Sequence, residues 1–106
     1  MTFEEFWPQY LRAHGDARTR ACHVAGTLAG SALVLSALAI RRPWLLVAGL
    51  IAGYGPAWYS HAFIEHNKPE TLRAPLASLR GDYLMTYHML RGSIDEEYRR
   101  TAADAT

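Results

Sequence analysis

The chain has 106 residues, which is enough for one domain and too few for two. Half of it is apolar. Its net charge is only +1, whereas a nucleic-acid-binding protein needs a concentrated basic surface. The single cysteine, Cys22, excludes an internal disulfide framework, and residues 1–20 lack the basic start and apolar core of a secretory signal peptide. We therefore predict one domain over residues 1–100, a disordered tail over 101–106, and no nucleic-acid partner.

The first predicted element is a short helix that begins at Phe3. Thr2 and Glu5 have the capping-box pattern, and Pro8 predicts a kink. Apolar and aromatic side chains recur at helical spacing along it, together with one histidine. They are Phe3, Phe6, Trp7, Tyr10, Leu11 and His14. This aromatic composition is typical of a membrane–water interface, where we expect the helix to lie.

Two long uncharged stretches follow. Asp16 is the predicted N-cap of a helix that carries no charge over 24–40, and a second uncharged stretch covers 44–64. They span about 26 and 32 Å, against about 30 Å of bilayer hydrocarbon. A soluble bundle with two buried helices is the alternative, but neither stretch has a polar face, and so short a chain cannot cover both helices. We predict an all-α integral membrane hairpin of two transmembrane helices, with flanking amphipathic interfacial helices.

The arrangement of the two spans follows from the link between them. Arg41-Arg42-Pro43 is so short that the helices must be antiparallel, with both termini on one side. Gly26 with Gly30, and Gly49 with Gly53, are small-residue pairs that allow close packing. Basic residues near the membrane are more numerous on the terminal side than in the loop, so the positive-inside rule predicts cytoplasmic termini. They are Arg12, Arg18, Arg20, Lys68, Arg73 and Arg80.

A third helix is predicted after the polar turn at 65–69. It carries apolar residues at helical spacing, and Gly92 is its predicted stop. These residues are Leu76, Leu79, Tyr83, Tyr87 and Leu90. We expect this amphipathic helix on the same membrane surface as the first, followed by one more short helical turn capped by Ser93.

Five histidines gather at one end of the predicted hairpin. His23 opens the first span and His61 and His66 close the second, so these positions meet at one depth of an antiparallel pair. His14 and His88 lie on the same side. The spacing of His61 and Glu65 puts them on one face of an α-helix, within reach of a single ion.

Imidazoles with a carboxylate suit zinc or non-haem ferrous iron. A lone histidine at a membrane interface is commonly only a polar anchor, and Glu65 can equally pair with Lys68 or Arg73. Ionisable groups at the edge of a span are nevertheless costly to desolvate, which favours a functional site at His23, His61 and Glu65.

Four segments of the chain resemble the Mpo1-like family over nearly its whole length, from about Phe3 to Leu90. They are Tyr10-Leu-Arg-Ala-His14, His23-Val-Ala-Gly26-Thr27, Trp58-Tyr-Ser-His61-Ala-Phe-Ile-Glu65-His-Asn67-Lys-Pro69-Glu-Thr71 and Pro75-Leu-Ala-Ser78-Leu-Arg-Gly-Asp82. The stretch from His61 to Pro69 is the most specific part.

The resemblance implies an Fe(II)-dependent dioxygenase that acts on 2-hydroxy fatty acids in α-oxidation, with dioxygen as co-substrate. It implies His14, His23 and His61 as iron ligands, and Glu65 as a catalytic fourth ligand or a group that orients one. A 2-hydroxy acid would enter from the bilayer, chelate the iron and lose one carbon, while its acyl tail stays in lipid.

Two alternatives to the dioxygenase stay open. A zinc-dependent membrane hydrolase would use the same ligands, and a non-enzymatic small membrane subunit or assembly protein would bind no metal. The sequence also leaves open a homo-oligomer and the roles of His66 and His88.

Overall fold

The computed structural model describes residues 1–103, which form helices joined by short turns. The predicted all-α class is confirmed for this part of the chain. The elements are α1 (Phe3–Ala13), α2 (Ala17–Ile40), α3 (Pro43–Ser60), the π-helical turn η1 (His61–Glu65), the 3₁₀ turn η2 (Glu70–Leu72), α4 (Pro75–Arg91) and α5 (Ile94–Thr101).

The helix ends follow local signals in the sequence. The side chains of Thr2 and Asp16 accept backbone N–H groups at the starts of α1 and α2, at 3.2 and 2.8 Å. Pro43 is the first residue of α3, and Gly92 ends α4 with a left-handed φ of 81°. These four predicted boundaries are confirmed.

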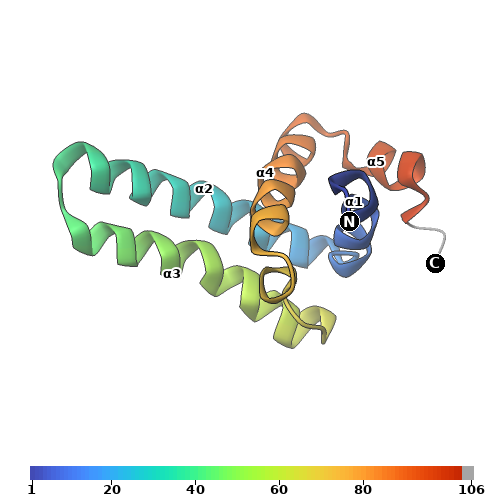
Figure 1. Cartoon of the computed structure of the whole chain (residues 1–106), viewed down its shortest axis with the longest axis horizontal. Helices are drawn as coiled ribbons and strands as arrows, with labels where there is room; N and C mark the ends of the chain where they lie inside the picture. The colour runs from blue at the N-terminus through green and yellow to red at the C-terminus, as the bar shows by residue number, and fades with distance from the viewer. Residues whose placement is uncertain (104–106) are drawn as a thin grey trace.

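Helices α2 and α3 form an antiparallel hairpin that extends away from α1, α4 and α5 (Figure 1). Their backbones touch at the predicted glycine pairs. A Cβ atom on Gly26 would lie 2.6 Å from the carbonyl oxygen of Gly53, and one on Gly30 would lie 2.9 Å from that of Gly49. No side chain fits at these distances, so glycine sets the spacing of the hairpin.

The two hairpin helices differ in apolar character. Among the described residues only α2 is long and apolar enough to cross a membrane, and 22% of its most apolar stretch is buried. Helix α3 has 18 residues, includes Trp44, Tyr54 and Pro56, and does not meet the same measure of length and composition. The predicted hairpin is therefore present. Its length and composition support α2 as a membrane span, but they do not support α3 as a second one.

The aromatic face of α1 lies inside the protein, in contrast to the predicted position at a membrane surface. Helices α4 and α5 cover it, and the buried core consists of Phe6, Trp7, Tyr10, Leu11, Met85, Ile94 and Ala103. Pro8 is accommodated within α1, and the predicted kink does not end the helix. The N-terminal helix thus builds a protein core whose covering helices come from the far end of the sequence.

Helix α4 turns its apolar stripe outward. Leu76 is 82% exposed and Leu90 is 67% exposed, whereas the small residues Ser78 and Gly81 are buried and Gly81 lies against Tyr10 of α1. The predicted tail begins within ordered structure, because Thr101 ends α5 and Ala103 is 2% exposed. The rest of that predicted tail, residues 104–106, lies outside the described part.

Candidate metal centre

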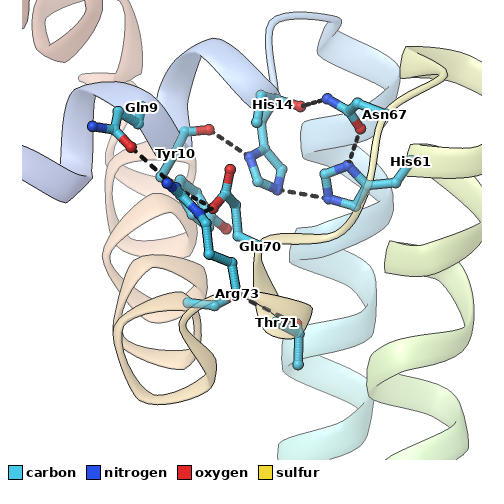
Figure 2. A network of polar contacts seen from close by, with 10 residues as sticks. Gln9, Tyr10, His14, His61, Asn67, Glu70, Thr71 and Arg73 are labelled. Atoms are coloured by element: carbon cyan, nitrogen blue, oxygen red, sulfur yellow. Dashed lines mark hydrogen bonds and ion pairs between the residues drawn. The ribbon is translucent and has the colours of Figure 1, made fainter.

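Three histidines from separate segments meet where the base of the hairpin joins the other helices. His14 is the C-cap of α1, His23 lies in the second turn of α2, and His61 opens η1. The Nε2 atom of His14 is 3.0 Å from Nε2 of His23 and 3.1 Å from Nε2 of His61. All three rings are at least 96% buried. Figure 2 shows His14 and His61 pointing toward each other from α1 and the end of α3.

The opposite ring nitrogens all meet oxygen acceptors. Nδ1 of His14 and Nδ1 of His23 each lie against the backbone carbonyl four residues earlier, at 2.6 and 2.9 Å. Nδ1 of His61 is 2.6 Å from the side-chain oxygen of Asn67. Because a carbonyl oxygen can only accept, each Nδ1 carries the proton and donates it. The three Nε2 atoms, which face one another, are therefore unprotonated.

Such a cluster fits a metal ion. Three nitrogen lone pairs that face one another have no donor between them, and burial lowers the pKa of His14 well below its usual value, so protonation there is disfavoured. A cation bound by all three would satisfy them. Two metal–nitrogen bonds of about 2.1 Å at a right angle separate the nitrogens by about 3.0 Å, close to the distances found here. The three buried histidines can thus hold a metal ion.

Asn67 is the site residue that the sequence analysis missed. Its side-chain N–H₂ donates to the carbonyl of Ala13 at 3.1 Å, which turns the amide oxygen toward His61 (Figure 2). The π-helical turn η1 brings Asn67 back to this position, with His66 at its end in a left-handed conformation, φ 59°. The available signal was its place within the specific stretch from His61 to Pro69.

Glu65 lies apart from the cluster of mutually close ligand atoms. Its carboxylate accepts the backbone N–H of Asp16 at 2.7 Å, just before α2 begins. This contact directs the Glu65 carboxylate to the start of α2. His66 is exposed, and His88 contacts Ser93, so neither joins the three histidines.

The backbone around His14 is held by two side chains from elsewhere in the fold. The guanidinium of Arg20 donates to the carbonyls of His14 and Gly15 at 3.0 and 2.9 Å. The hydroxyl of Tyr98, in α5, lies 2.6 Å from the carbonyl of Leu11 and 2.9 Å from that of His14. The turn that carries His14 is thereby fixed to both α2 and α5.

One face of the His14 ring is covered by Tyr10. The two ring centroids are 3.9 Å apart in a stacked arrangement. The Tyr10 hydroxyl donates to the carboxylate of Asp82 in α4. Burial raises the pKa of Tyr10 well above its usual value and raises that of Asp82 to about 6, while the Tyr10 hydrogen bond acts to lower it. Helix α4 is thus connected to the three histidines through Tyr10.

Comparison with known proteins decides the family. The model of a family described as "2-hydroxy-palmitic acid dioxygenase Mpo1-like" matches residues 1–94. The chain belongs to the Mpo1-like family. The matched part of this Mpo1-like chain includes the three histidines, Glu65 and Asn67, whereas Tyr98 lies beyond it. No curated protein and no solved structure matches the chain significantly.

Proposed function

We propose that this Mpo1-like chain is an Fe(II)-dependent membrane dioxygenase that shortens 2-hydroxy fatty acids by one carbon. The observation that carries the proposal is the convergence of three buried, unprotonated Nε2 atoms, from His14, His23 and His61. The family description supports the dioxygenase reaction and a 2-hydroxy fatty acid substrate.

The iron, when bound, supplies the redox chemistry that activates dioxygen for cleavage of the C1–C2 bond. The protein keeps the three imidazoles neutral and oriented through the hydrogen bonds of their Nδ1 atoms. With only three protein ligands, coordination positions stay open for the substrate and dioxygen. Glu65 acts here as a positioning residue, because its contact with Asp16 holds the turn that carries His14.

A membrane location is supported by the apolar surface. Helix α2 has the length and composition of a span, and large apolar residues of both hairpin helices face outward. They include Leu35, Leu38, Val47, Leu50 and Ile51. The outward stripe of α4 would lie in the membrane surface beside the hairpin base. We propose that α3 is the second span and that both termini are cytoplasmic, opposite Arg41 and Arg42.

Zinc is the second candidate metal, because three neutral imidazoles are also a ligand set of catalytic zinc. In that case the site would lower the pKa of a bound water, and the protein would be a hydrolase. The two functions differ in metal content and in their need for dioxygen.

Elemental analysis of protein purified anaerobically in mild detergent tests the proposal. We expect near-stoichiometric iron in the wild type and its loss in His61→Ala. His66→Asn is the matched control, because His66 is exposed and asparagine tolerates its left-handed backbone. Iron retained in His61→Ala would contradict the ligand assignment, zinc in place of iron would favour the hydrolase, and no metal after reconstitution with Fe(II) would reject both.

The loaded protein is then supplied with 2-hydroxypalmitic acid and dioxygen. We expect oxygen uptake that depends on the hydroxy acid and a product one carbon shorter. Palmitic acid, which lacks the 2-hydroxyl group, is the control substrate. Equal oxygen uptake with both acids would exclude this reaction.

A further inference from the structure

A groove of about 410 Å³ lies between α2, α3 and α4. Its floor is formed by the glycines at which the hairpin helices touch, so no side chain fills it there. Its walls are mainly apolar, and they include Val34, Leu35, Leu50, Tyr54, Leu79 and Tyr83. A groove of this volume is in the range of sites that hold one small molecule.

The inner end of the groove is linked to the three histidines through two helices, α2 and α4. Gly26 and Thr27 line it and lie about one helical turn after His23 on α2. Asp82 lines it from α4 and is bonded to Tyr10, whose ring stacks on His14. His23 thus lies one helical turn from the groove lining, and His14 is linked to that lining through Tyr10 and Asp82.

The outer end of the groove opens toward the apolar exterior. Between Gly26 and Leu35 helix α2 rises by about 14 Å. Leu35, Leu50 and Leu79, which line the groove, are 66, 56 and 45% exposed. The groove therefore leads from the metal centre along the hairpin to the surface that would face lipid.

Three polar side chains in the groove, those of Ser31, Asp82 and Tyr83, already have protein partners. The hydroxyl groups of Ser31 and Tyr83 are 2.5 Å apart and bond to each other, linking α2 to α4. The Asp82 carboxylate accepts from Tyr10. Because these groups are satisfied within the protein, the groove fits hydrocarbon better than a polar ligand.

We propose that this groove holds the acyl chain of one 2-hydroxy fatty acid, with the carboxyl and hydroxyl groups at the three histidines. This inference rests on the proposed function and places in the groove the tail that the sequence analysis left in lipid. An acyl chain is favoured over a helix from a second copy, because the groove is already bounded by α2, α3 and α4, and Ser31 and Tyr83 link α2 to α4 within it. The position of the outer end then sets the preferred chain length.

Photo-crosslinking tests the groove without requiring turnover. The probe is a 2-hydroxy fatty acid with a diazirine near the end of its tail, added anaerobically to the purified iron-loaded protein. We expect labelling of the peptides that contain Leu35, Leu50 and Leu79. In Leu50→Trp the indole fills the groove, and labelling should fall by about tenfold or more, an effect that a single misfitting methylene can reach in an apolar pocket.

Ile51→Trp is the matched control, because Ile51 is 66% exposed on α3 and does not line the groove. It should keep wild-type labelling. If a hairpin variant does not fold, a second pair on α4 replaces it. Leu79→Trp is then the groove variant and Leu76→Trp its control. Labelling spread evenly over the exposed hairpin, or unchanged in both groove variants, would overturn the proposal. Loss of labelling that accompanies a change from dimer to monomer would also overturn it, because the groove would then be a subunit interface.

The outcomes distinguish failure of the proposed acyl site from failure of the proposed function. Groove labelling in a protein that takes up no iron or oxygen would reject the proposed function and keep the acyl site. Iron-dependent turnover without groove labelling would reject the acyl site and keep the function. If both groove labelling and iron-dependent turnover are observed, Leu50→Trp should lower kcat/KM for 2-hydroxypalmitic acid more than for 2-hydroxyoctanoic acid.

Discussion

Asn67 connects the π-helical turn to the histidine cluster through a single amide. Its oxygen accepts the Nδ1 proton of His61, and its N–H₂ group holds the carbonyl of Ala13, next to His14. One side chain therefore fixes the tautomer of one proposed ligand and the position of another. Groups that orient metal-binding histidines in this way typically contribute 10–100-fold to metal affinity.

Replacement of Asn67 separates its two roles. Asn67→Ala should lower the affinity for Fe(II) by about 10–100-fold, measured by competition with a chelator. Asn67→Asp keeps an acceptor for His61 and loses the donor to Ala13, so it should bind more tightly than the alanine variant. Equal affinities in wild type and Asn67→Ala would show that the tautomer of His61 is fixed by another group.

The residues of the site differ in how far the sequence could predict them. His23 and His61 could be brought together because an antiparallel hairpin places chain positions of equal depth side by side, whereas His14 was implied as a ligand only by the family resemblance. The position of the Glu65 side chain could not be predicted, because its carboxylate accepts the backbone N–H of Asp16, 49 positions away, from the end of a π turn. Asn67 depends on the same turn. No local pattern distinguishes a π turn from the end of an α-helix, since both have the same composition.

At the scale of the helices, the packing of α2 on α3 depends on the absence of side chains at their contact. Gly26→Ala would place a Cβ 2.6 Å from the carbonyl oxygen of Gly53, so the helices must move apart. We expect a loss of about 1–3 kcal/mol in the free energy of unfolding, measured by thermal denaturation in detergent.

Gly55→Ala is the matched control, since a Cβ at Gly55 meets nothing within 4 Å. It should leave stability unchanged or raise it by up to about 1 kcal/mol, because alanine favours helix over glycine. Equal destabilisation by the two substitutions would indicate that close contact between the helices does not stabilise the hairpin.

Helix α5 is attached to the rest of the molecule through Glu97. Hydrogen bonds from Arg100, and from the indole N–H of Trp7 at 3.1 Å, hold the pKa of Glu97 at about 2, below its usual value. The unfolded state therefore binds a proton on Glu97 at higher pH than the folded state does. The stabilisation is complete above about pH 4.5 and is lost as the pH falls toward 2.

We expect hydrogen exchange in α5 to speed up over this interval, and Glu97→Gln to remove that pH dependence. Glu96→Gln, at the adjacent exposed position, is the control and should behave as wild type. If the wild type and Glu97→Gln changed with pH in the same way, the docking of α5 would not depend on this carboxylate.

Helix boundaries were more predictable than helix environments. Thr2, Asp16, Pro43 and Gly92 act within a few residues of their own position, so the sequence alone places the ends of α1, α2, α3 and α4. The burial of the aromatic face of α1 depends on α4 and α5, more than sixty residues away. An aromatic stripe has the same composition whether protein or lipid covers it.

The whole molecule is elongated, 46 Å in its longest dimension, with the hairpin at one end and both described termini toward the other (Figure 1). If the hairpin crosses a bilayer, its loop and its termini lie on opposite sides. In a Cys22→Ser background, a cysteine at Arg42 should react with an impermeant thiol reagent from outside intact cells, and one at Thr2 should react only after lysis. Labelling of both positions from the same side would contradict the two-span arrangement.

The three proposed ligands come from segments that are made at different times, since His14 precedes His61 by 47 positions. The centre is therefore incomplete until α3 has been synthesised and has folded back against α2. Under the proposed function, a nascent or truncated chain cannot retain iron and so cannot generate reactive oxygen in the membrane. Metal loading then reports that the whole hairpin has been assembled, and oxygen chemistry is confined to finished molecules.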